Sequence, residues 1–303
     1  MSTIAVTLVV ISAVIHAGWN LLSKSNHPQP VFFFVSSLAG AVLLLPFPLL
    51  YFDFVLGDIP VRVWLLLVAT GFFMALYYIG LAGAYRSGDM SVAYPLARSV
   101  PVLLVAAVTF ILDQGDRISA SCLAGLALIF VGCFLIPQRR FGDIHLKNYF
   151  TPTCGLALVA AVGTTGYSVL DDKALRLLRS TPPPDVPDIP MALLYACLQA
   201  AITCIWLALY ILVTHGWRSG IRSAMRMKIR HAIFAGLAIH LAYGIVLISL
   251  AYVDNVSYVV GLRQLSIPLG ALLGIMVLHE EPCVPKLVGT AIMFGGLLLV
   301  AFG

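Results

Sequence analysis

The chain has 303 residues, of which 61% are hydrophobic and only 10% are charged, with a formal net charge of +5. A typical soluble domain has about 25% charged residues, so this composition excludes a water-soluble globule, a disordered chain and a nucleic-acid-binding protein. A membrane-spanning helix needs about 20 apolar residues, so the length holds roughly ten of them and leaves no room for a soluble domain.

Apolar segments follow one another along the chain, and all of them are expected to be helices. Each is continuously apolar, whereas the strands of a membrane barrel would alternate apolar and polar positions. The predicted segments are 3–22, 31–51, 63–84, 92–112, 118–136, 153–170, 190–214, 231–252, 256–278 and 284–302.

Three of the predicted connections are longer than a turn. Residues 137–152 are basic, and residues 171–189 contain four prolines, which predicts a stiff extended linker. Residues 215–230 carry five Lys or Arg side chains and are expected to form a short basic helix on the membrane surface.

The Lys and Arg residues of the connections predict an orientation. With alternating helices, the side that holds both termini has five of them and the opposite side has eleven. Cytoplasmic loops carry the excess of Lys and Arg, so we expect a multi-pass protein of the inner (plasma) membrane with both termini outside. The eleven are Lys24, Arg86, Arg139, Arg140, Lys147, Arg218, Arg222, Arg226, Lys228, Arg230 and Lys286.

A weak internal repeat divides the chain. Residues 99–101 (Ser-Val-Pro) are matched 167 positions later by residues 266–268 (Ser-Ile-Pro). Residues 125–132 resemble residues 289–296 in the same order, each octet beginning and ending with glycine.

The repeat predicts an all-α membrane protein made of two halves, residues 1–147 and 148–303, each with five helices. An odd number of helices per half makes the second half enter the membrane from the opposite side. Such inverted repeats are typical of secondary transporters, whose substrate site lies in a central cavity near the midplane between the halves.

Two arginines lie inside predicted spans, on equivalent helices of the two halves. Arg98 and Arg263 are each followed by a helix-loosening proline, Pro101 and Pro268. Two guanidinium groups facing one cavity would bind a carboxylate or phosphate. The alternatives are an internal ion pair or side chains that reach the lipid headgroups.

Other polar residues of the spans are weaker candidates. His16 and Asn20 share one helix face with Lys24 at its end, and His16 could carry a proton, although both could equally bond to neighbouring helices. Gln264 could hydrogen-bond across the cavity, whereas His240 is more typical of helix packing.

Tyrosines and glycines complete the candidate site. Tyr78, Tyr94 and Tyr258 are candidate substrate contacts, although such rings also pack or lie at the membrane interface. Gly270 and Gly274 form a GxxxG pair expected to serve close helix packing or a hinge.

The carboxylates are expected to lie outside the middle of the spans. Asp171 and Asp172 are interpreted as the end of the sixth helix. Lipophilic-cation exporters usually need a buried acid, so the buried arginines favour anionic or zwitterionic solutes. The six cysteines are interpreted as small buried hydrophobes, and neither a metal site nor a cofactor is expected.

Several of these stretches resemble the drug/metabolite transporter superfamily, specifically the ten-helix EamA-type transporters. The resemblance covers nearly the whole chain and rests on residues 16–20 (HAGWN) with Lys24, and on residues 88–101 and 256–268. It rests further on Glu280-Glu281 before a Gly-rich last helix. It implies two inverted five-helix repeats around a central cavity and transport of small organic solutes, often outward.

The leading hypothesis is a secondary transporter that exports anionic or zwitterionic metabolites such as amino acids or organic acids. The alternatives are a multidrug exporter of the same fold or a membrane scaffold. An intramembrane enzyme is not favoured, because the sequence offers no HExxH, no paired aspartates at membrane depth and no G-x-S-x-G. The chain also lacks a Walker A pattern, so ATP is not expected to drive transport directly. Expected partners are a small-molecule substrate, the lipid bilayer and, for coupling, the proton; the oligomeric state is left open.

Overall fold

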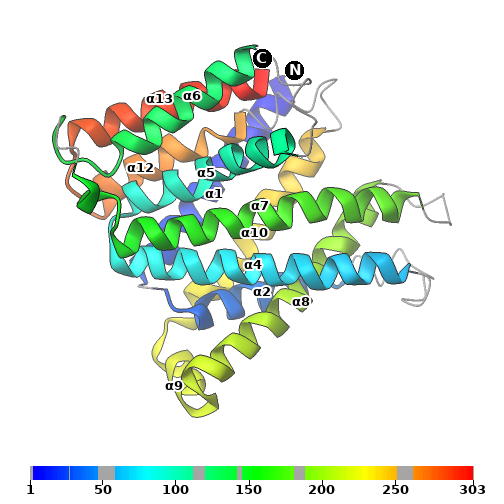
Figure 1. Ribbon diagram of the computed structural model, residues 1–303. Coiled ribbons are helices and arrows are strands. Elements are labelled where there is room, and N and C mark those ends of the chain that lie inside the picture. Colours follow the sequence, from blue (N-terminus) through cyan, green and yellow to red (C-terminus); the bar gives the residue numbers. More distant parts are fainter. Residues whose placement is uncertain are drawn as a thin grey trace.

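The computed structural model describes residues 3–26, 28–46, 59–111, 120–141, 145–180, 188–250 and 262–302, and this part of the chain is helical without any strand (Figure 1). Five helices are long and apolar enough to cross a membrane, namely α1, α4, α7, α8 and α10, and shorter apolar helices accompany them. The protein is therefore a multi-pass membrane protein. The helices are α1 (Thr3–Ser25), α2 (Pro30–Leu44), α4 (Val61–Ser87), α5 (Met90–Ile111), α6 (Ala120–Leu135), η3 (Leu146–Asn148), α7 (Pro152–Arg179), α8 (Asp188–His215), α9 (Trp217–Arg226), α10 (Ile229–Leu250), α12 (Ser266–Val277) and α13 (Val284–Phe302).

Each of the ten predicted segments contains a helix, and the predicted basic helix exists as α9. Five predicted spans are only partly described, and in two of them the undescribed stretch is long. The helix of segment 31–51 ends at Leu44, with residues 47–58 outside the described part, and that of segment 256–278 begins at Ser266, with residues 251–261 outside it.

The predicted linker over residues 171–189 is wrong for its first part, because α7 continues as a helix to Arg179. Ala174 and Leu178 are fully buried in a cluster with Val63 and Leu67 of α4, which holds this extension against its neighbour. The four prolines lie in residues 181–187, outside the described residues.

Long helices from the two halves of the chain pack in pairs (Figure 1). α4 lies along α7, α1 along α10, α2 against α8, and α6 against α13, while α5 contacts both α7 and α12. The α4–α7 pair approaches backbone to backbone, since a Cβ on Gly80 would lie 2.6 Å from the Ala160 nitrogen. Small residues at such contacts are how membrane helices gain packing energy.

Glycines make the same close contact between α6 and α13. A Cβ on Gly125 would lie 2.6 Å from the Gly296 carbonyl oxygen, and a Cβ on Gly296 would lie 2.6 Å from that of Gly125. Gly132 and Gly289 face each other in the same way. These are the four glycines that bound the repeated octets.

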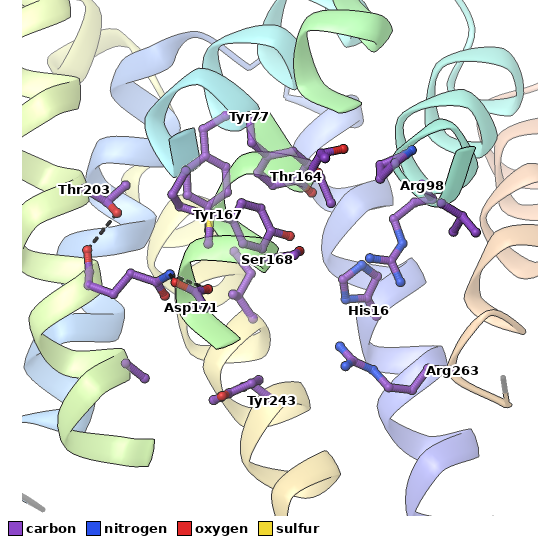
Figure 2. A pocket seen from close by; sticks show the side chains of 18 of the residues that line it. His16, Tyr77, Arg98, Thr164, Tyr167, Ser168, Asp171, Thr203, Tyr243 and Arg263 are labelled. Carbon is purple, nitrogen blue, oxygen red and sulfur yellow. Dashed lines mark hydrogen bonds between the residues drawn. The ribbon is translucent and has the colours of Figure 1, made fainter. Parts of the chain in front are cut away.

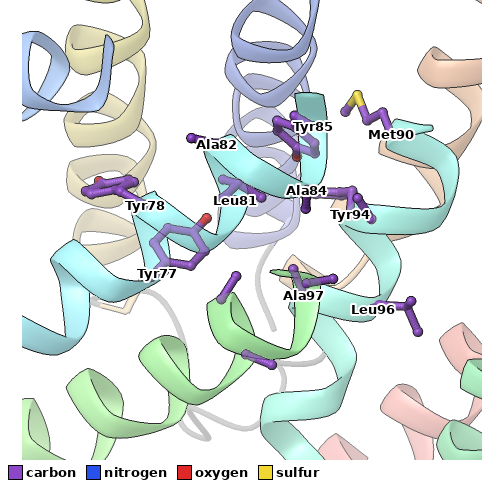
Figure 3. Close-up of a cluster of buried hydrophobic side chains, with 14 of the residues drawn as sticks. Tyr77, Tyr78, Leu81, Ala82, Ala84, Tyr85, Met90, Tyr94, Leu96 and Ala97 are labelled. Atoms are coloured by element: carbon purple, nitrogen blue, oxygen red, sulfur yellow. The ribbon is translucent and has the colours of Figure 1, made fainter. Parts of the chain in front are cut away.

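The main buried cluster lies where α4 meets α5 (Figure 3). Figure 3 shows Tyr85 and Ala84 of α4 near Tyr94 of α5, with Tyr77 and Tyr78 further along α4. Since aromatic rings bury large areas, this cluster fixes α4 and α5 beside the cavity described next.

The prolines that follow the two arginines act differently from each other. α5 runs without interruption through Pro101, so the unwinding expected there does not occur. Pro268 lies in the first turn of α12, where a missing N–H costs little. The helix is interrupted just before it, at the turn of Gln264 and Leu265, directly after Arg263.

Candidate functional site

A cavity of about 610 Å³ lies between α1, α4, α5, α7, α8, α10 and the Arg263–Gln264 segment (Figure 2). Its wall combines aromatic rings with hydroxyl, amide, guanidinium and carboxylate groups. The volume lies within the range of small-molecule sites, which are mostly apolar with a few polar groups in fixed positions.

Arg98 of α5 and Arg263 both line this cavity, as the equivalence of their helices predicts. Figure 2 shows their side chains approaching from the side of α1, with His16 between them. The Nε atom of Arg98 is buried and has no hydrogen-bond partner among the described residues. Within the described ranges, neither arginine forms a salt bridge with a carboxylate, so their charge is available to a ligand.

His16 of α1 also lines the cavity. Its Nδ1 accepts a hydrogen bond from the Trp19 Nε1 at 3.4 Å, and the two rings meet edge to face with centroids 5.1 Å apart. Because an indole nitrogen can only donate, this contact leaves the proton of a neutral His16 ring on Nε2. In the described part of the chain, that buried Nε2 has no hydrogen-bond partner.

Asn20 and Lys24, the other members of the α1 stripe, do not line the cavity. The Asn20 amide is fully buried, donates to the His16 carbonyl at 2.8 Å and accepts from the Tyr85 hydroxyl at 2.7 Å. Lys24 Nζ donates to the carbonyl oxygens of Tyr85, at 2.6 Å, and Gly88. Both side chains therefore join α1 to the end of α4. For Asn20 this agrees with the alternative interpretation, in which the side chain bonds to a neighbouring helix.

The candidate tyrosines divide between cavity and core. Tyr78 lines the cavity and stacks on Phe33 with centroids 4.8 Å apart. Tyr94 is almost fully buried and does not line the cavity, and its ring centroid lies 6.3 Å from that of His16. Its ring packs on the face of α12 at Gly270, which has no side chain. Tyr258 lies outside the described residues.

Two further candidates have clear places. Gln264 lines the cavity, and its buried Oε1 has no hydrogen-bond partner within the ranges that the structure describes. Gly274 packs against the start of α5, where a Cβ would lie 3.1 Å from the Ser91 nitrogen. The GxxxG pair thus serves packing of α12 on α5.

A carboxylate lies in the cavity, although the carboxylates were expected only outside the middle of the spans and Asp171 was expected at the end of its helix. Asp171 is eight residues from the end of α7 and half-buried in the cavity wall. It accepts hydrogen bonds from Thr70 at 2.5 Å, from the Tyr195 hydroxyl at 2.6 Å, and from Gln199 Nε2 at 3.0 and 2.9 Å. The adjacent pair of aspartates suggested a helix end, whereas apolar Leu170, Ala174 and Leu178 at four-residue spacing signal that the helix continues.

A polar network joins the start of α5 to the segment between α12 and α13. The Glu280 carboxylate accepts from the backbone nitrogens of Met90 at 2.6 Å and Ser91 at 2.8 Å, which caps α5. The buried Lys286 ammonium group forms a 3.0 Å salt bridge with Asp89. One end of the molecule is thus tied across the two halves of the sequence.

No group of three or more His, Cys, Asp or Glu side chains that could hold a metal ion occurs within the described ranges. Six cysteines lie there, three of them buried.

Comparisons with known proteins bear on this arrangement. Residues 3–137 match the model of the EamA-like transporter family. A solved structure described only as "Crystal structure of protein" covers 98% of this chain and 96% of its own, with a TM-score of 0.59 and 19% identity. At that identity the likeness shows a common fold alone. No curated protein matches the chain.

Proposed function

We propose, from the match of residues 3–137 to the EamA-like transporter family, that the protein is a secondary transporter of small anionic or zwitterionic organic solutes, working in the direction of export. One observation carries the substrate class. Arg98 and Arg263, which lie 165 positions apart in the sequence, face one cavity of about 610 Å³ without a carboxylate partner among the described residues. A buried guanidinium without a counter-ion is costly, and an anionic ligand supplies that counter-ion.

Helix pairing supports the architecture of two inverted five-helix repeats, residues 1–147 and 148–303. The first five apolar helices are α1, α2, α4, α5 and α6, and their counterparts in order are α7, α8, α10, α12 and α13. When each helix is replaced by its counterpart, the contact α4–α7 turns into the contact α10–α1, which is also present. The contact α6–α13 is unchanged by the same replacement. The reciprocal contacts Gly125–Gly296 and Gly132–Gly289 obey the same exchange. Alternating access then follows from one half rocking against the other around the cavity.

The test is a binding and transport screen of small acids, amino acids and lipophilic cations with the purified protein in proteoliposomes. Arg98→Gln and Arg263→Gln should each weaken binding of the transported anion at least tenfold, because each removes one charge-assisted contact. Arg62→Gln, on an exposed side chain at the start of α4, is the matched control and should bind normally. Normal transport by both cavity variants would refute the anion site.

A multidrug exporter remains the second candidate, because Asp171 removes the argument that the cavity lacks an acid. Asp171 and the rings of Trp19, Tyr77, Tyr78 and Tyr167 line the same cavity, and such a wall suits a lipophilic cation. Transport of ethidium that is unaffected by Arg98→Gln and Arg263→Gln would favour this candidate over the first.

The proposed orientation places both termini outside the cell. It is supported by the Lys and Arg count and by the basic helix α9, which would lie at the cytoplasmic face. A reporter enzyme that is active only in the cytoplasm, fused after Gly303, should be silent, and the same reporter inserted after Arg218 should be active.

A further inference from the structure

We propose that Asp171, with Thr70, Tyr195 and Gln199, forms a fixed subsite for the positively charged nitrogen of the solute, opposite the two arginines. This inference rests on the proposed function and narrows its substrate class. It selects molecules that carry an ammonium group as well as an acidic group, and excludes simple organic anions.

Burial disfavours the charged form of the Asp171 carboxyl group, and hydrogen bonds from three side chains oppose that effect. Gln199 Nε2 donates to both of its oxygens, at 3.0 and 2.9 Å, and the Tyr195 hydroxyl donates to Oδ1 at 2.6 Å. The Thr70 hydroxyl adds a bond of 2.5 Å. These partners come from α4 and α8, so two helices besides its own fix its position. A carboxylate that accepts several hydrogen bonds is stabilised in its charged form.

The negative charge of Asp171 has no cationic partner in the described part of the chain. Its neighbour Asp172 points the other way, and its exposed carboxylate pairs with Arg176 at 2.9 Å. A half-buried charge inside a span is costly unless a partner compensates it. Since Asp171 faces the cavity, a cation held there would be that partner.

The cavity therefore has two poles. Figure 2 shows Asp171 on one side and Arg98, His16 and Arg263 on the other, with Tyr167 between them. A simple anion would leave the Asp171 charge unpaired, and a simple cation would leave both guanidinium groups unpaired. A solute with both charges satisfies both poles, and hydroxyl groups such as that of Ser168 can bond to the part between them.

The experiment compares matched ligands that differ only in the amino group, with calorimetric binding to the purified full-length chain. The pairs are L-glutamate and glutarate, L-valine and isovalerate, and L-phenylalanine and 3-phenylpropionate. The wild-type protein should bind the amino member of at least one pair at least tenfold more tightly than its partner.

The near-isosteric variant Asp171→Asn should abolish that preference by weakening the amino member at least tenfold, while the deamino member binds as well as before or better. Retained binding of the deamino acid shows that the variant is folded. Asp172→Asn, one residue further along α7 with an exposed side chain, should keep the full preference.

The alternative outcomes separate the two levels of the proposal. Equal binding of both members of every pair, or a preference that survives Asp171→Asn, overturns the cation subsite and leaves the anion site intact. Binding of simple anions that requires Na⁺ and Asp171 also overturns it, because the subsite then holds an inorganic ion. Binding of none of the six acids overturns the proposed function itself.

Discussion

At the residue scale, two polar side chains near the cavity illustrate opposite uses of a polar group inside a membrane helix. Both ends of the Asn20 amide are hydrogen-bonded to protein groups, so a ligand has nothing left to bind. The Arg98 Nε is buried beside the cavity and has no hydrogen-bond partner in the part of the chain that the structure describes. A polar group inside a membrane is costly unless it has a partner. The protein itself supplies the partners of Asn20, which stabilises the fold, whereas a ligand would supply the partner of Arg98.

Replacement of Asn20 by alanine is expected to affect stability rather than binding. Asn20→Ala leaves the buried Tyr85 hydroxyl without its acceptor, which should lower the free energy of unfolding by about 1–3 kcal/mol. Thermal unfolding in detergent measures the change, and affinity for the transported anion should stay within twofold. Ser25→Ala, at the exposed end of the same helix, is the control. An Asn20→Ala protein of normal stability that fails to bind would place Asn20 in the site instead.

His16 is the residue we expect to couple transport to protons. In its neutral form its Nδ1 accepts from Trp19 and its Nε2 carries the proton, so a second proton must displace Trp19. His16→Gln should therefore remove the stimulation of transport by an imposed pH gradient while ligand binding persists. His240→Gln is the matched control, because His240 also lines the cavity but has Nδ1 bonded to the Gly236 carbonyl at 2.9 Å. A His16→Gln protein that still responds to the gradient contradicts this role.

At the element scale, the continuation of α7 to Arg179 keeps Asp171 within a helix that lines the cavity. Continuous apolar runs predict the positions of the helices well, because a bilayer leaves few other structures available. The repeat likewise predicts that Arg98 and Arg263 lie on equivalent helices. Sequence spacing could not show that Asn20 meets Tyr85, 65 residues away, or that Tyr94 packs on Gly270. Those contacts depend on how helices cross, and periodicity within one helix does not determine crossing.

The contact of α6 with α13 allows a comparison of neighbouring glycines. A Cβ on Gly296 would meet the Gly125 carbonyl oxygen at 2.6 Å and the Ile129 nitrogen at 2.9 Å, whereas one on Gly295 meets nothing within 4 Å. Gly296→Ala should therefore destabilise the protein by about 1–3 kcal/mol, since backbone atoms cannot move aside cheaply. Gly295→Ala should be neutral or slightly stabilising. Thermal unfolding of the two variants is the measurement, and equal effects would show that α6 and α13 are not in close contact.

At the scale of the whole molecule, alternating access requires contacts that hold one end closed while the other end opens. Glu280 caps α5, and Lys286 pairs with Asp89 at the same end. These contacts join the first half of the sequence to the second. The buried position of Lys286 means that separation of the halves would expose an ammonium group and a carboxylate to water, where both are well solvated. The end can therefore open without a large electrostatic penalty.

A covalent link at this end should stop transport without stopping binding. In a protein whose six cysteines are replaced by alanine or serine, Asp89→Cys and Lys286→Cys place two thiols at positions whose native side chains meet at 3.0 Å. A short, reductant-cleavable thiol cross-linker should join them, reduce transport to the level of empty liposomes and leave ligand binding within a few-fold of normal. Reductant should restore transport, and each single-cysteine variant should be insensitive to the reagent. Full transport by the cross-linked protein would contradict this role, because alternating access through this end requires the end to open.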